Sequence, residues 1–178
     1  GVLLPVTRVP FRVQLDPGRL FSQVSLSGFV GEDVDLVGVR VGTGAELLLG
    51  FTFRPTDHLT LQAVSQLSWL NVADPPLGSG RLFTAQVQRL KATYNFTSRL
   101  FVRLIGQYVE TKRDVSLYPS AVLAREESFS GSALLSYRIN WQTAFFLGYG
   151  DDREEASAGY LARTGRQFFV KLSYAFQR

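Results

Sequence analysis

The chain has 178 residues, of which 46% are hydrophobic, and a net charge of +4 at neutral pH. Cysteine is absent, which excludes disulfide frameworks and thiol-ligated metal sites. Polar residues interrupt every apolar run before the roughly 18 residues that a membrane-spanning helix needs, and the basic residues are too scattered to form a nucleic-acid-binding patch. The length therefore fits one domain that is neither a helical membrane protein nor a nucleic-acid-binding protein.

Apolar and polar residues alternate with a period of two along most of the chain, a pattern typical of strands with one apolar face. The first such segment is 6–15, where Val9, Phe11 and Val13 alternate with Arg8 and Arg12. The alternation predicts an all-β, antiparallel domain. Eight further strands are expected at about 20–30, 45–54, 58–71, 82–95, 98–112, 127–139, 141–150 and 166–177.

The segment 82–95 fits the alternation less well than the others. The apolar positions from Leu90 to Tyr94 share one face, whereas those from Phe83 to Val87 have the opposite parity. A β-bulge near Gln88 would reconcile the two halves, because a bulge adds one residue to one strand.

The connections between these strands alternate in length. Tight turns rich in Pro, Gly, Asn or Asp are expected at 16–19, 54–58, 95–99 and 138–142, and longer polar loops at 31–44, 73–81, 113–126 and 151–165. Short turns at one rim and long loops at the other are typical of bacterial outer-membrane barrels, whose short turns are periplasmic.

The combined pattern predicts an antiparallel transmembrane β-barrel of about eight strands over 20–178, located in the bacterial outer membrane with the lipid bilayer as its partner. Residues 1–19 are expected to be an N-terminal arm or an extra strand. Single-chain bacterial barrels have an even number of strands, so a ninth strand would indicate an excerpt of a larger barrel. A start at Gly1 without methionine is expected for processed protein or for such an excerpt.

The last strand ends in an aromatic-x-aromatic pattern, Tyr174-Ala175-Phe176, which resembles the signal that the barrel-assembly machinery reads on its client proteins; here Gln177 and Arg178 follow it. The segments RLKATYNFTSRLFVRLIGQY, LLSYRINWQTAFFLGYG and RQFFVKLSYAFQR resemble the closing strands of a poorly characterised family of outer-membrane proteins, in which a carbohydrate-binding-module-like domain precedes the barrel. The resemblance covers about residues 20–178 and brings no catalytic motif. It implies a barrel that is assembled through its C-terminal strand.

Strand parity places a set of charged, mostly basic residues on the face that would line the barrel lumen. In a wide pore these residues would favour anions. In a narrow eight-stranded barrel they would instead pair with Glu46, Glu110 and backbone groups, and the barrel alone would conduct poorly. The predicted lumen-lining residues are Arg8, Arg12, Glu46, Arg54, Arg89, Lys91, Arg103, Arg138 and Lys171.

Aromatic residues on the opposite face gather near the strand ends, as expected for the two aromatic girdles at the membrane interfaces. Those near the tight turns are Phe53, Tyr94, Tyr137, Trp141, Tyr174 and Phe176, and those near the longer loops are Trp69, Tyr108 and Tyr149.

Catalytic and metal-binding residue sets are sparse. His58 is the sole histidine, so a hydrolase site has one place to begin, and a turn or interface role suits it better. The acidic stretch 151–155 lacks the regular ligand spacing of a calcium loop and is expected to be a solvated loop. The sequence thus predicts a non-enzymatic membrane anchor or porin-like channel without cofactor or metal. The alternatives are an outer-membrane barrel enzyme and a soluble lipocalin-like barrel.

Overall fold

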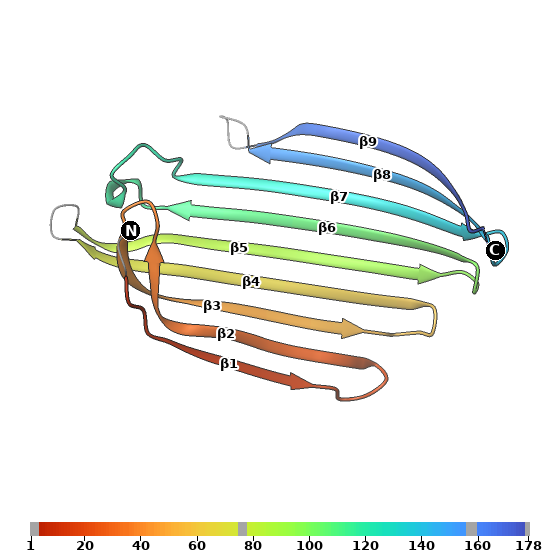
Figure 1. Cartoon of the computed structure of the whole chain (residues 1–178), viewed down its shortest axis with the longest axis horizontal. Coiled ribbons are helices and arrows are strands. Elements are labelled where there is room, and N and C mark those ends of the chain that lie inside the picture. Colours follow the sequence, from red (N-terminus) through yellow and green to blue (C-terminus); the bar gives the residue numbers. More distant parts are fainter. Residues whose placement is uncertain (1–3, 75–77, 156–159, 177–178) are drawn as a thin grey trace.

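The computed structural model describes residues 4–74, 78–155 and 160–176 and shows an all-β chain. Nine antiparallel strands form one sheet in chain order, each paired with the strand before it (Figure 1). No helix in the described ranges is long and apolar enough to cross a membrane. The elements are β1 (Arg8–Leu15), β2 (Phe21–Asp35), β3 (Arg40–Phe53), β4 (Leu59–Asp74), β5 (Gly78–Asn95), β6 (Leu100–Arg113), the 3-10 turn η1 (Val115–Leu117), β7 (Arg125–Arg138), β8 (Thr143–Glu155) and β9 (Leu161–Tyr174).

The pairing register sorts the strand residues onto two faces, because directly paired residues point to the same side of a sheet. Leu104, for example, pairs with Ala92 on one side and Ala133 on the other. The apolar face carries Val13, Leu26, Leu49, Leu61, Leu90, Leu104, Leu135, Leu147 and Val170, and the polar face carries Arg12, Ser25, Thr52, Gln62, Lys91, Arg103, Ser132, Asp152 and Lys171. The prediction of antiparallel strands with one apolar face is confirmed.

The apolar face is open to its surroundings across the sheet. Leu90, Leu104 and Val170 are 53%, 52% and 59% exposed, although they lie on strands in the middle and at the edge of the sheet. No second layer of the described chain packs on them, since all of its strands belong to the one sheet. The face therefore buries little of the apolar surface that normally stabilises a fold.

A small core instead lies at the end of the sheet away from the short turns. Leu117 of η1 is 3% exposed and packs against Leu70, Val72 and Leu82. The side chain of Arg40 donates a hydrogen bond to the carbonyl oxygen of Leu117. Because Leu70 and Arg40 belong to the polar face, the β6–β7 connection folds over that face at one end of β3, β4 and β5.

The bulge predicted near Gln88 is wrong in position. Gln88 pairs in regular register with Ser65 and Tyr108, and the shift in the β4–β5 pairing lies at Leu82. The parity is unbroken because the side chains of Gln86 and Gln88 lie on the apolar face, where their amides donate to Glu110 and Ser65. A hydrogen-bonded amide costs far less on such a face than an unpaired one.

The long loops predicted at one rim are mostly strand extensions. Residues 31–44 form the ends of β2 and β3 with a turn at 36–39, closed by an ion pair of 2.9 Å between Arg40 and Asp35. The connection at 114–124 remains a true long connection. Polar residues at strand ends pair as well as apolar ones when their partners lie opposite, so polarity alone overestimates loop length.

Apart from β1, the strands have 13 to 18 residues, more than the roughly 9–11 that cross a bilayer.

The sheet is open, so the predicted closure into a barrel is not present in this structure. β1 and β9 form its two edges, and Arg8–Leu15 is a strand paired with β2. Each strand is antiparallel to the one before it, so β1 and all later odd-numbered strands, including β9, run in the same direction (Figure 1).

The close approach of β2 and β3 depends on Gly28. A Cβ atom built on Gly28 would lie 1.9 Å from the carbonyl oxygen of Glu46, whereas one on Gly106 would meet the Phe129 ring at 3.8 Å. We expect Gly28→Ala to destabilise the sheet by about 1–3 kcal/mol because the backbones must separate. Gly106→Ala is the matched control and should leave the unfolding midpoint unchanged or raise it slightly. Thermal unfolding followed by circular dichroism compares the two variants. Equal unfolding midpoints would contradict the close approach of β2 and β3 at Gly28.

Candidate functional site: the two faces of the sheet

Aromatic rings gather at both ends of the apolar face. Phe53, Tyr94, Tyr137 and Tyr174 lie at the strand ends next to the short turns, with Trp141 in the β7–β8 turn and Phe176 just beyond β9. Several rings touch, as Tyr94 contacts Phe96 and Tyr174 contacts Phe176, each at 4.8 Å between centroids. At the other end of the strands are Trp69, Tyr108 and Tyr149, and between the two sets the residues are mainly aliphatic.

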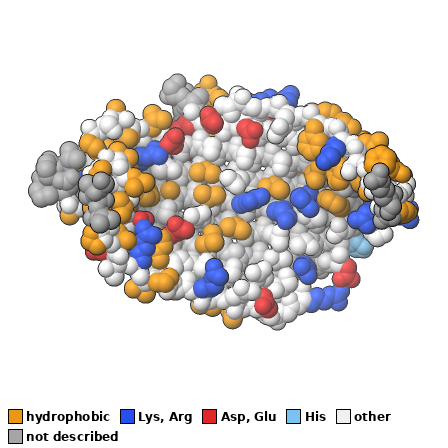
Figure 2. Space-filling view, in the orientation of Figure 1, with side chains coloured by type: hydrophobic (Ala, Val, Ile, Leu, Met, Phe, Trp, Pro, Cys, Tyr) orange, Lys and Arg blue, Asp and Glu red, His pale blue; other side chains and the backbone are white. Residues whose placement is uncertain are grey.

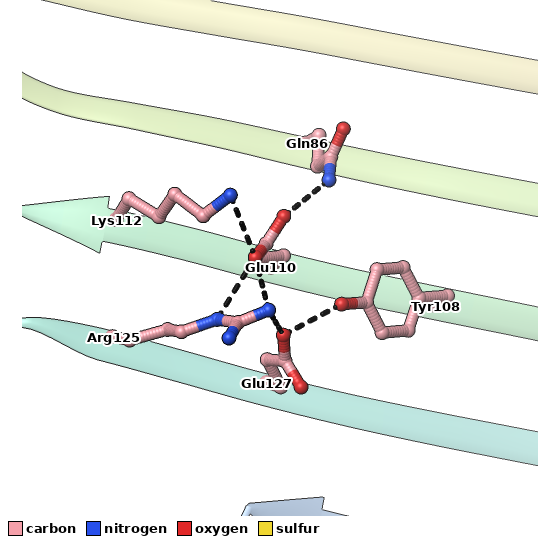
Figure 3. A network of polar contacts seen from close by, with 6 residues as sticks. All are labelled: Gln86, Tyr108, Glu110, Lys112, Arg125 and Glu127. Carbon is pink, nitrogen blue, oxygen red and sulfur yellow. Dashed lines mark hydrogen bonds and ion pairs between the residues drawn. The ribbon is translucent and has the colours of Figure 1, made fainter. Parts of the chain in front are cut away.

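A network of charged side chains lies on the apolar face directly beyond Tyr108 (Figure 3). Its centre is Glu110, which is 4% exposed and accepts from Lys112 at 3.1 Å and from Arg125 at 2.8 Å, and also from Gln86. Arg125 pairs in addition with Glu127, which accepts from the Tyr108 hydroxyl at 2.9 Å. The apolar region of β6 and β7 therefore ends at a row of hydrogen-bonded charges.

A second group of charges ends the apolar region of β8 and β9 in the same way. Asp151, two residues beyond Tyr149, lies 2.7 Å from Arg153 and 2.7 Å from Arg163. The Tyr149 hydroxyl lies 3.4 Å from the same carboxylate. In both groups an aromatic ring stands between the aliphatic surface and the charges, as in residues that lie at a boundary between an apolar and an aqueous phase.

The predicted lumen-lining residues of the strands all lie on the polar face, and Arg54 lies in the turn after β3. Arg8 is paired with Asp33. Within the described ranges no ion pair is formed by Arg12, Glu46, Arg54, Arg89, Lys91, Arg103, Arg138 or Lys171.

This arrangement corrects one expectation. Pairing of the basic residues with Glu46 and Glu110 was one of the two alternatives, but Glu110 lies on the other face and Glu46 has no ion pair in the described chain. On the polar face, acidic and basic side chains pair at the end away from the short turns, as Arg8 does with Asp33 and Arg40 with Asp35. Figure 2 shows further Lys and Arg side chains over the middle of this face and toward the end with the short turns.

His58 lies at the end with the short turns, in the β3–β4 turn. Its Nδ1 is 2.8 Å from the carbonyl oxygen of Asn95, which assigns the ring proton to Nδ1 as donor. The neighbouring Asp57 pairs with Arg19, and this hydrogen bond lowers the pKa of the Asp57 carboxyl below its usual value. Among the described residues, no hydroxyl hydrogen-bonds to the His58 ring, so the ring has no nucleophile beside it.

The acidic stretch 151–155 belongs to β8, where its side chains alternate between the faces. Asp151 lies with the apolar-face residues and Asp152 on the polar face. No group of three or more His, Asp or Glu residues that could hold a metal ion occurs in the part of the chain that the structure describes.

Sequence reasoning missed the two charged networks and the core under η1. A signal for the networks was available, since Glu110, Lys112, Arg125 and Glu127 have the parity of the apolar residues that precede or follow them. Along these alternating positions, the change from aromatic to charged residues marks the end of the apolar region. No local pattern indicates that Leu117 packs against Leu70, because the two residues are far apart in sequence.

Comparison of the chain with protein-family models, with curated proteins and with solved structures gave no significant match. The function is therefore inferred from the two faces alone.

The Glu110 network gives a testable contribution to stability. Glu110→Ala leaves Gln86 and Arg125 without their central acceptor, so we expect a loss of on the order of 1–3 kcal/mol in unfolding free energy. The matched control is Asp57→Ala, which removes a fully exposed pair with Arg19 and should change little. Denaturant titration in detergent measures both variants. If Glu110→Ala costs no more than Asp57→Ala, the network does not hold β5, β6 and β7 together.

Proposed function

We propose that this chain is a wall of a bacterial outer-membrane β-barrel, without catalytic activity, whose polar face lines an aqueous, anion-preferring pore. The observation that carries the proposal is the contrast between the faces: an exposed apolar face with aromatic rings at both ends, and a polar face with unpaired basic side chains.

The apolar face supports a lipid environment. Exposed apolar surface is unfavourable in water by about 25 cal/mol per Å², so a continuous face of this kind requires an apolar partner. The rings of Trp69 and Tyr108 at one end and of Tyr94 and Tyr137 at the other suit the two headgroup regions. The charged networks around Glu110 and Asp151 would then lie just outside the hydrocarbon, at the rim with the long β6–β7 connection.

The two open edges set a condition for insertion. Backbone N–H and C=O groups in hydrocarbon must all be hydrogen-bonded, so both β1 and β9 need a neighbouring strand in the membrane. Because these edges run in the same direction, closure by antiparallel pairs alone requires an odd number of further strands, which makes the total even. The C-terminal strand, with the contacting rings of Tyr174 and Phe176, is the segment that the barrel-assembly machinery would read.

The polar face supports a hydrated pore more than a filled interior. A buried charge without a partner costs several kcal/mol, so unpaired Arg89, Lys91 and Arg103 require water beside them. A wide lumen supplies that water, and its positive potential favours anions. The β6–β7 connection, held over the polar face by Leu117 and Arg40, would narrow one mouth of the pore.

The two tryptophans, Trp69 and Trp141, test the membrane placement. Trp69 lies on the apolar face near one end, and Trp141 lies in a turn at the other end, so both are expected at interfaces. In Trp69→Phe and Trp141→Phe variants, the remaining tryptophan should be quenched more by lipids brominated close to the headgroup than by lipids brominated at the chain ends. A protein that stays monodisperse without detergent, or fluorescence indifferent to bromine, would refute the proposal.

Ion selectivity tests the pore. In planar bilayers containing the protein, the reversal potential under a KCl gradient should indicate a preference for chloride. Replacing Arg89, Lys91 and Arg103 by Glu should move the reversal potential toward cations, because the charges that face the lumen are inverted. The control replaces the exposed Lys112, a basic residue of the other face, by Gln and should leave selectivity unchanged, because Glu110 keeps its ion pair with Arg125. Cation preference in the unaltered protein would exclude an anion-preferring pore, and the absence of conductance would exclude any pore and leave the anchor role.

A further inference from the structure

A hollow of about 340 Å³ lies on the polar face between β2 and β5. Arg89 and Lys91 of β5 form one side of it, Gln62 of β4 and Thr52 of β3 lie next to them, and Ser25 of β2 is on the other side. This volume is at the lower end of the range for small-molecule sites, so a small solute would fit.

The depth of the hollow depends on Gly50. This residue faces the hollow from β3 between Ser25 and Val64, and a Cβ atom there would lie 2.9 Å from the Ser25 hydroxyl oxygen. The Ser25 hydroxyl has only a weak contact of 3.4 Å with the Gly50 carbonyl oxygen. A side chain at position 50 would therefore displace the Ser25 hydroxyl and reduce the volume of the hollow.

The charge around the hollow is of one sign. Arg89 pairs across the sheet with Val64 and Gln107, and Lys91 pairs with Gln62 and Ile105, so the nearest neighbours on both sides are uncharged. Neither Arg89 nor Lys91 forms an ion pair or a side-chain hydrogen bond in the described chain.

A third cation stands beside this pair. Arg103 of β6 is paired with Thr93, two residues beyond Lys91. It does not line the hollow, since its guanidinium lies over the Phe101 ring at 5.3 Å, and its Nε is buried without a hydrogen-bond partner among the described residues. A buried guanidinium N–H that lacks an acceptor is costly, and an anion nearby would reduce that cost.

We propose that Arg89 and Lys91, with the hydroxyl and amide groups of Ser25, Thr52 and Gln62, form a binding site for a phosphate group, either inorganic phosphate or a small phosphate monoester. A phosphate accepts several hydrogen bonds and carries up to two negative charges, which matches a site with two cations and neutral donors around an open hollow. The inference rests on the proposed pore for its role, since such a site would concentrate one class of anion at the lumen wall. The binding itself depends only on the polar face.

Isothermal titration of the 178-residue chain in detergent micelles, at constant ionic strength in chloride, tests the site with inorganic phosphate and with glucose 6-phosphate. Saturable binding is expected, weakened at least tenfold in the double variant Arg89→Gln with Lys91→Gln. The matched control is Arg12→Gln with Lys171→Gln, which removes two cations of the same face from the edge strands and should bind normally. Circular dichroism confirms that each variant is folded.

A second variant separates a shaped site from diffuse attraction. Gly50→Leu keeps every cation but fills the hollow, so it should abolish binding, whereas attraction by overall positive charge would be unaffected. Binding of glucose 6-phosphate but not of inorganic phosphate would assign the site to monoesters, and the reverse to the free ion. Absence of saturable binding, or equal binding in all variants, overturns the inference even if the bilayer shows anion preference. Binding without any conductance overturns the pore and leaves the site.

Discussion

The exposed apolar face is the constraint on which the rest of this structure depends. Nine strands place aliphatic and aromatic residues on one side of a single sheet, and no other described element covers them. In water such a sheet would lose the hydrophobic contribution that normally offsets the conformational entropy of folding. The sheet therefore depends for its stability on whatever covers this face, and the hydrogen bonds between strands fix its shape more than a core does.

The limits of the apolar face are set by hydrogen bonding as much as by hydrophobicity. Glu110 and Asp151 lie with the residues of that face yet are almost fully enclosed by the arginines and lysine that they bind. A tyrosine precedes each carboxylate by two residues, with Tyr108 donating to Glu127 and the Tyr149 hydroxyl close to Asp151. Such an order, from aliphatic to aromatic to charged residues, lets one face pass from an apolar to an aqueous phase with the Glu110 and Asp151 carboxylates paired.

Much of the fold could be predicted from the sequence because a period of two needs only local information. Each predicted strand is present, and the alternation assigned Leu104 and Arg103 to the correct opposite faces. The bulge near Gln88 was misplaced because a polar residue on an apolar face looks like a change of parity, while its hydrogen bond to Ser65 depends on a neighbouring strand. The extended hairpin ends look like loops in the sequence for the same reason: their polar residues pair with a neighbouring strand, as Asp33 does with Gly42, and the sequence does not show this pairing. The packing of Leu117 on Leu70, and whether β1 and β9 meet, are non-local properties that no window of sequence contains.

The distribution of charge on the polar face follows from the same separation of environments. At the ends of β2 and β3 away from the short turns, Asp33 and Asp35 pair with Arg8 and Arg40, so the charges neutralise one another and fix the hairpin. Over the middle of the sheet no such pairing occurs between described residues, and Arg89 and Lys91 have only uncharged residues opposite them on the neighbouring strands. Paired charges add rigidity but little electrostatic potential, whereas unpaired charges of one sign produce an electrostatic potential that acts on a nearby solute. If the sheet had only a structural role, acidic partners for the basic residues in its middle would stabilise it, as they do at its end. Among the described residues, no acidic side chain pairs with Arg89 or Lys91, and this is the feature that the proposed pore and anion site would use, whereas the folding of the sheet does not require it.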